Sequence, residues 1–333
     1  MLEEDAPSPE PLPDVDLSAD ARFLNSKAWT MRWSDRKRSS DLAWQALQRS
    51  ESQRPPDSEG VALACRTLAW QAKWAGDFDA AQTLCRRAQA RLSPERNAVA
   101  LADVLSTLGV VHYSRGRRDL ALSVTRRGLA LIEDVDAASA RIDLLTTLAT
   151  IHRYNGRMFE AYEALQSARN LSQRGERARV DHNMARCLEQ DNSPSRAVGY
   201  AMRSVIGARR HKNRVVLPYA LEVLGIALGR LENYGLAMTY LEEGLAIAQE
   251  DGDNRAHCQI LEQIGHIRHE SDATEKALEA LSDGLRLAER LDYPIWQRKF
   301  LHKIARIEQE RGNHSAAVEA FSKLVVLMES ERA

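Results

Sequence analysis

Hydrophobic and polar positions follow the period of an amphipathic helix along most of the chain, and the helical segments come in pairs. The second segment of each pair carries a small residue and, seven positions later, another residue that is usually small, as in Ala81 and Ala88. The leading alanines are 40, 40, 36, 40, 40 and 40 residues apart. They are Ala81, Ala121, Ala161, Ala197, Ala237, Ala277 and Ala317. A repeated spacing of this length is typical of a solenoid built from similar units.

The first segment of each pair has its own mark, a large residue followed by a small one, 13 and 12 positions before the alanine. Glycine, asparagine and aspartate lie between the two segments, where a turn is required. Prolines stand where helices are expected to begin, because proline fits the first turn of a helix. These prolines are Pro94, Pro194, Pro218 and Pro294.

This pattern resembles the tetratricopeptide repeat (TPR) family in a form with a 40-residue period. The resemblance covers roughly residues 20–330 and implies an all-α fold, a right-handed superhelix (α-solenoid) of about eight antiparallel helix pairs. We assign residues 19–333 to this solenoid. The first pair fits least well, because its Ala43 stands only 38 residues before Ala81. The 36-residue step lacks about one helical turn, so we expect a weak interface and a hinge at 169–195, between repeats 1–4 and 5–8.

Glycines recur inside the second segments, at Gly128, Gly244 and Gly284. Each costs roughly 1 kcal/mol of helix propensity relative to alanine. All three stand seven residues after a leading alanine. We therefore expect them where the two helices of one unit cross closely, because a side chain larger than alanine at that crossing would force the helices apart.

Composition adds limits on class and location. Residues 1–18 are rich in proline and acids, and the first 20 residues hold seven acids and no base, so we expect a disordered tail. Four cysteines are scattered singly, which favours reduced, packed thiols in a cytoplasmic protein. No apolar run could span a membrane. Because no catalytic or cofactor-binding motif is present, we expect neither an enzyme nor a cofactor.

In the TPR family the concave surface is mostly lined by first helices. Mapping the repeat register onto that surface predicts a basic and aromatic groove in the N-terminal half. Its candidate residues are Arg66, Trp70, Lys73, Trp74, Tyr113, Arg153, Tyr154, His182 and Arg186. Such a lining favours an extended acidic or aromatic peptide, since cations attract it and aromatic faces supply contact area. The alternative is that the tryptophans pack between repeats and the arginines are solvated. The acidic tail could also occupy this half as an internal competitor. Trp70 stands where some family members place an asparagine that binds a peptide's terminal carboxylate, which argues against that type of receptor.

In the C-terminal half the candidate groove residues are Glu262, His266, His269, His302 and Arg306. His266 and His269 share a helix face and, with His302, could converge on a metal ion. Groove-lining or solvated histidines are the simpler interpretation, and we expect no metal. The basic run at 207–216 could contact phosphate groups, but we expect no nucleic-acid partner, because the repeats resemble no nucleic-acid-binding fold.

The favoured function is a scaffold or adaptor that binds a protein or peptide in its groove. One alternative comes from residues 24–47, which resemble the opening repeat of bacterial TPR input regions that precede GGDEF (diguanylate cyclase) domains. The matching residues are Asn25, Ala28, Trp29, Arg32, Ser34, Asp35, Leu42 and Ala43. No GGDEF sequence is present, so this alternative implies an output domain beyond Ala333. The third alternative is a peptide-sensing transcriptional regulator. Val325, Leu327 and Met328 in the last helix would meet a second copy of the chain, a further domain or a partner.

Overall fold

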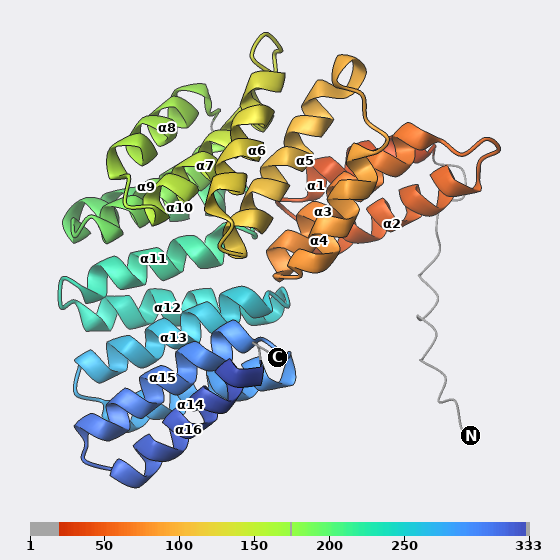
Figure 1. Cartoon of the computed structure of the whole chain (residues 1–333). Coiled ribbons are helices and arrows are strands. Elements are labelled where there is room, and N and C mark those ends of the chain that lie inside the picture. The colour runs from red at the N-terminus through yellow and green to blue at the C-terminus, as the bar shows by residue number, and fades with distance from the viewer. Residues whose placement is uncertain (1–19, 174, 331–333) are drawn as a thin grey trace, which may run out of the picture.

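The computed structural model describes residues 20–173 and 175–330, and the regular structure in these ranges is helical (Figure 1). The tail expected at residues 1–18 lies outside the described residues. Sixteen helices form eight successive pairs in the described part of the chain. They are α1 (Ala21–Met31), α2 (Arg36–Ser52), α3 (Ser58–Ala75), α4 (Phe78–Gln89), α5 (Pro94–Ser114), α6 (Arg118–Leu131), α7 (Ala138–Tyr154), α8 (Met158–Leu171), α9 (Arg177–Gln190), α10 (Pro194–Arg210), α11 (Leu217–Gly229), α12 (Tyr234–Glu250), α13 (Asn254–Glu270), α14 (Thr274–Arg290), α15 (Pro294–Glu310) and α16 (His314–Ser330).

Small residues hold the paired helices close together, as the sequence predicts. All seven leading alanines, from Ala81 to Ala317, are buried. A Cβ added at Gly284 would lie 2.3 Å from the ring of Phe300, and one at Gly128 would lie 2.7 Å from Leu144. One at Gly244 would meet three atoms at 3.2–3.3 Å. At Gly128 and Gly284 the nearest atoms belong to the first helix of the next pair, not to the partner helix of the same unit as predicted, so these glycines allow close packing between repeats. Gly244 faces both α11 and α13 at less restrictive distances.

The turns inside the pairs repeat with the same spacing as the alanines. From the second pair onward, each contains one residue with positive φ, a conformation that glycine adopts most readily. These residues are Gly76, Gly116, Gly156, Asn192, Glu232, Asp272 and Gly312. The 36-residue step falls where α8 is followed by α9, whose 14 residues contrast with 17 in α7 and α13. The hinge predicted at 169–195 covers this junction and stays a prediction.

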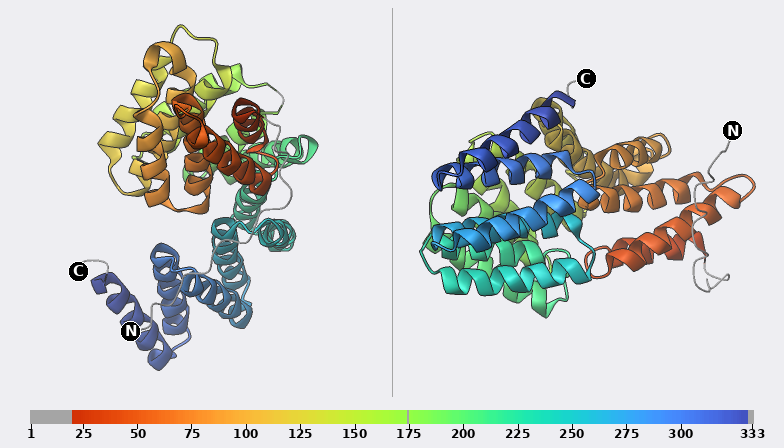
Figure 2. Two further views of the ribbon diagram at one scale, coloured as in Figure 1. Left: turned by 90° about the vertical axis from the view of Figure 1, so that its right-hand side faces the viewer. Right: turned by 90° about the horizontal axis from the view of Figure 1, so that it is seen from below.

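The eight pairs stack in chain order along an arc, with the first helix of each pair on the inner side (Figure 1). The arc also coils out of its plane, so that α13–α16 project away from the pairs that precede α11 (Figure 2). This coiling brings the second and seventh pairs together, and α3 is in contact with α13.

Polar bonds join the two ends of the arc at this contact. Arg36, the first residue of α2, forms an ion pair of 3.0 Å with Asp253, which caps α13. The Tyr293 hydroxyl donates a hydrogen bond of 2.5 Å to the Ala75 carbonyl oxygen at the end of α3. These contacts join residues more than 200 positions apart, and they enclose one side of the space inside the arc.

The described part of the chain has neither a disulfide nor a helix that could span a membrane. Cys65, Cys85, Cys187 and Cys258 are free and buried. Burial raises the pKa of each thiol, so the cysteines stay protonated near neutral pH. Among the described helices, none is long and apolar enough to cross a membrane.

Candidate functional site

A cavity of about 920 Å³ occupies the inner side of the arc. Every pair contributes to its wall through its first helix or an adjoining loop, so the cavity extends along the solenoid. Of the fourteen sequence-predicted groove residues, ten line it. They are Trp70, Lys73, Trp74, Tyr113, Arg153, Tyr154, His182, Arg186, Glu262 and His266. Arg66, His269, His302 and Arg306 do not line it.

Tryptophans from the first two pairs form one cluster at the N-terminal end of the cavity. The ring of Trp33, in the turn after α1, lies 4.8 Å from Trp70 and 5.8 Å from Trp74, measured between centroids. Trp74 lies 5.5 Å from Tyr219 of α11. Trp70 is 2% exposed, so its main role is packing between repeats, while Trp74 carries the cluster across to the other half of the arc.

Arg66 is removed from the open groove by Trp29. Its guanidinium stacks on the Trp29 ring at 3.8 Å and forms an ion pair of 3.1 Å with Asp103 of α5. Burial raises the pKa of Asp103, and Arg66 opposes this rise through its charge and hydrogen bond. The sequence register placed Arg66 in the groove, but its charge is already neutralised inside the wall.

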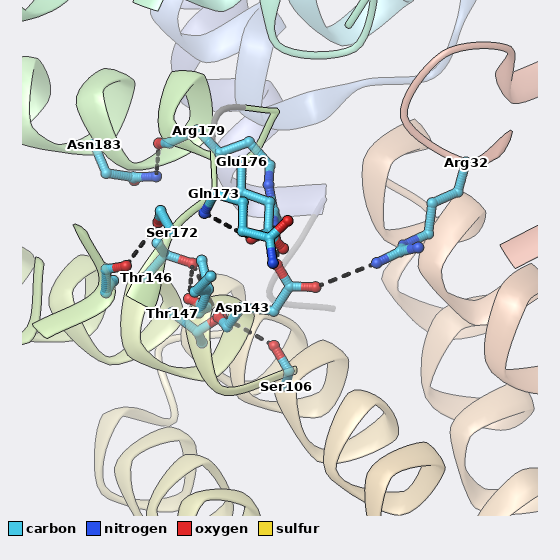
Figure 3. A network of polar contacts seen from close by, with 12 residues as sticks. Arg32, Ser106, Asp143, Thr146, Thr147, Ser172, Gln173, Glu176, Arg179 and Asn183 are labelled. Atoms are coloured by element: carbon cyan, nitrogen blue, oxygen red, sulfur yellow. Dashed lines mark hydrogen bonds and ion pairs between the residues drawn. The ribbon is translucent and has the colours of Figure 1, made fainter. Parts of the chain in front are cut away.

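A second buried charge group joins the first pair to the middle of the arc (Figure 3). Asp143 of α7 accepts a hydrogen bond from Arg179 of α9 and lies 3.7 Å from Arg32, the residue after α1. Arg179 also stacks over the Trp33 ring at 4.3 Å. Arg32 thus reaches across the cavity end from the first repeat to the fourth. These links hold the N-terminal end of the cavity in one shape.

Lys73 of α3 faces the cavity in a different state. Its Nζ atom lies 5.3 Å from the ring centroids of both Trp70 and Trp74. Burial, followed by the charges of Arg32 and Arg179, lowers the pKa of Lys73 to about 7. Within the described ranges, Lys73 forms no hydrogen bond or ion pair. The charged form of Lys73 is therefore destabilised by burial and by the neighbouring positive charges.

Aromatic and basic residues line the middle of the cavity. Tyr113 and Tyr154 lie 4.8 Å apart between ring centroids, and the Arg153 guanidinium stacks over Tyr154 at 3.9 Å. Arg186 forms an ion pair of 3.0 Å with Glu222 of α11, which is 1% exposed. His182 stays neutral, because burial and the nearby arginines Arg186 and Arg153 lower its pKa to about 3.

Only two of the five groove residues predicted in the C-terminal half line the cavity. Glu262 and His266 line the wall, and Glu262 is paired with Lys303 at 2.9 Å. His269 instead contacts Glu310 at 2.8 Å, while His302 and Arg306 are exposed on α15. The three histidines do not converge. No group of three potential ligand residues in the described part of the chain could hold a metal ion.

Sequence reasoning missed several wall residues, chiefly Trp29, Trp33, Arg179, Tyr219 and Arg255. Trp33 and Arg179 lie near the two irregular places, the first pair and the 36-residue step, where the repeat register fails. Tyr219 and Arg255 face the N-terminal half only because the arc closes. A period in the sequence cannot show that closure.

The last helix bears exposed apolar side chains. Val325 is 52% exposed and Met328 is 40% exposed, and Val318 and Val326 are exposed beside them. Leu327, the other residue predicted here, is about a third exposed or less. The prediction that this face meets a second copy or a further domain remains a prediction.

No protein-family model and no curated protein matches this sequence. Solved structures match its fold. A Rap protein complexed with competence and sporulation factor has a TM-score of 0.66 at 13% identity, over 93% of this chain and 98% of that one. The Cut9–Hcn1 hetero-tetramer of APC/C gives 0.66 at 13% identity, over 92% of this chain and 52% of that one. A signal-transduction ATPase from Pyrococcus horikoshii with a tetratricopeptide repeat sensor gives 0.59 at 14% identity, over 94% and 48%.

These likenesses confirm the fold predicted from the repeat. The chain is an all-α solenoid of TPR type, and proteins of this fold include ones solved with a bound factor or partner subunit. Identities of 13–14% concern fold alone. They leave the absence of catalysis, and the link to GGDEF proteins, as predictions from the sequence.

Proposed function

We propose that this chain is a peptide-binding adaptor that takes an extended segment of a partner protein into the cavity on its concave side. The observation that carries the proposal is the cavity itself, a continuous space of about 920 Å³ with first-helix residues from all eight pairs in its wall. Small molecules usually bind in enclosed and mainly apolar pockets. A cavity that extends along the solenoid fits a linear peptide better than such a compact ligand.

The wall offers the contacts that a peptide backbone needs. Amide and hydroxyl side chains such as Asn183, Gln259, Gln263 and Thr150 line the space beside the aromatic rings. Amides can donate to peptide carbonyls and accept from peptide N–H groups, while Tyr and Trp supply contact area at little entropic cost. Two solved structures with similar folds contain a bound factor or a partner subunit, and they support a role in binding a peptide or protein. A sensory region and a peptide-sensing regulator would use the same cavity.

The test is a selection of random dodecapeptides displayed on phage against the full chain. Binders are then measured against two variants. Thr150→Trp places a large ring into the cavity, whereas Arg126→Trp places the same ring on exposed α6, outside the cavity. We expect Thr150→Trp to abolish binding and Arg126→Trp to leave it unchanged. Peptides that bind the Thr150→Trp variant as tightly as they bind the wild type would refute a site in the cavity.

A further inference from the structure

The charges of the cavity wall are not evenly matched. Its buried or nearly buried carboxylates each form an ion pair with an arginine or lysine of a neighbouring repeat. They are Asp103, Asp143, Glu189, Glu222 and Glu262. These acids are therefore already neutralised and offer little attraction to a basic ligand.

Four cations of the wall have no carboxylate partner in the described ranges. Arg153 bonds to the Gln190 amide, and Lys299 is exposed beside the Trp296 ring. Lys73 and Arg255 are the partly buried ones without such a contact. Lys73 of α3 and Arg255 of α13 both line the cavity, and neither forms a hydrogen bond or ion pair with any residue in the described ranges. Both are only partly accessible to solvent. Partly buried cations normally have an anionic partner, because leaving water without one is costly. The unpaired charges therefore indicate a missing anion.

Lys73 and Arg255 stand on helices that are in contact where the arc closes. Helices α3 and α13 are in contact, and the aromatic pair of Trp74 and Tyr219 spans the same junction at 5.5 Å. Lys73 Nζ lies 5.3 Å from the Trp74 ring. Burial raises the pKa of Tyr219, as does Asp253, and the charge of Arg255 opposes that rise. At Lys73, burial, Arg32 and Arg179 lower the pKa, and Arg255 adds a smaller lowering. Repeats two and seven thus contribute both cations to the wall of one cavity, to which α3 and α11 contribute the Trp74 and Tyr219 rings.

We infer that Lys73 and Arg255 form a subsite for a carboxylate of the bound peptide, supplied by an acidic side chain or by the C-terminus. This inference rests on the proposed function and names the chemistry of one part of that site. A guanidinium and an ammonium can share the two oxygens of one carboxylate. The Trp74 and Tyr219 rings would pack against the adjoining methylene groups or backbone. A carboxylate held there joins α3 to α13 and so ties together the two ends of the arc.

The subsite is tested first without any peptide. The probe is N-acetylglutamate N-methylamide, compared with its neutral glutamine analogue at the same ionic strength, and the readout is the Tm of the full chain. Because a ligand of the folded state raises its stability, we expect the glutamate probe to raise the Tm and the glutamine analogue to leave it unchanged. Lys73→Met and Arg255→Gln should each abolish the shift, whereas Lys37→Met, at an exposed lysine of α2, should retain it.

Three results would overturn the inference. One is a Tm shift with the glutamine analogue that equals the shift with the glutamate probe. Another is a shift with the glutamate probe in both site variants that equals the shift in the wild type. The third is a Lys73-dependent shift with inorganic phosphate and none with glutamate, which would replace the carboxylate by a phosphate group. Because the two substitutions lie on different helices, loss of folding in one still leaves the other to decide.

A second measurement separates this inference from the proposed function. Phage-selected peptides that bind the cavity should carry an acidic residue whose replacement by its amide weakens binding to wild type about tenfold or more. The same replacement should have little effect on binding to Lys73→Met. Cavity binders whose affinity is indifferent to Lys73 and Arg255 would overturn the subsite while the peptide-binding function stands. A failed selection together with a glutamate-specific Tm shift would overturn peptide binding but keep the anion subsite.

Discussion

Replacing Lys73 by methionine should stabilise the protein at low pH, although lysine lies in a well-formed wall. In the folded state the pKa of Lys73 is lowered from 10.5 to about 7, chiefly by burial and then by Arg32 and Arg179. Because the unfolded chain binds this proton more tightly, the wild type loses stability wherever the lysine must be charged. The penalty is complete below pH 7 and decreases as the pH rises from 7 towards 10.5. Methionine has a similar length but carries no charge, so the substitution removes this penalty.

The shift sets the scale of the effect. It spans about 3.5 pKa units, which corresponds to about 5 kcal/mol at 1.36 kcal/mol per unit as an upper limit. Water that enters the open side of the cavity will reduce this figure, and the cation–π contacts with Trp70 and Trp74 are lost in the variant. We therefore expect Lys73→Met to raise the free energy of unfolding by about 2–4 kcal/mol at pH 6. Most of this gain should be gone by pH 10.5.

Urea unfolding followed by circular dichroism at pH 6, 8 and 10 measures the difference between variant and wild type. Urea carries no charge, so it leaves the electrostatic contribution intact. Lys37→Met is the matched control, because Lys37 is exposed on α2 and should change stability by less than about 0.5 kcal/mol at any pH. A gain that does not depend on pH, or a variant less stable than wild type at pH 6, would refute the account of Lys73 as an unpaired charge.

Two further substitutions test the packing and the paired charges. Gly284→Ala should destabilise the protein by about 1–3 kcal/mol, because its Cβ would lie 2.3 Å from the Phe300 ring. Gly235→Ala, also within a helix but with no atom within 4 Å, should stabilise it by up to about 1 kcal/mol, and a matching loss would contradict the packing argument. Arg186→Met should cost about 3–5 kcal/mol at pH 7, since it leaves buried Glu222 without a cation. Adding Glu222→Gln should recover most of that loss in thermal unfolding, and its failure to do so would show that Arg186 acts through packing alone.

Local features of this fold could be predicted because each depends on only two neighbouring helices. The register of the glycines at 128, 244 and 284 predicted close packing, and an added Cβ at each would crowd neighbouring atoms, although at 128 and 284 the nearest atoms belong to the next pair and not to the same unit. The predicted helix starts are also confirmed. Pro94, Pro194 and Pro294 open their helices, and Pro218 is the second residue of α11.

Closure of the arc could not be predicted, because it accumulates from small rotations over several repeats. Arg36 meets Asp253 and Tyr293 meets Ala75 only if five intervening pairs add up to the correct coil. The first pair, which fits the repeat least well, supplies much of what the register missed. Trp29 covers Arg66 and so removes it from the groove, where sequence reasoning had placed it.

The pairing of charges explains which predicted groove residues remain free to bind. Arg66 is paired with Asp103, 37 residues later, and Arg186 with Glu222, 36 residues later, so each pair spans about one repeat. Opposite charges at this spacing on first helices face each other in adjacent repeats and neutralise each other. Lys73 has no acid one repeat later on α5, and Asp35, one repeat earlier, caps α2 instead, so Lys73 lines the cavity without a carboxylate partner. Charge at the repeat spacing therefore indicates structure in this solenoid, and the unpaired charge of Lys73 is what we propose a ligand carboxylate to neutralise.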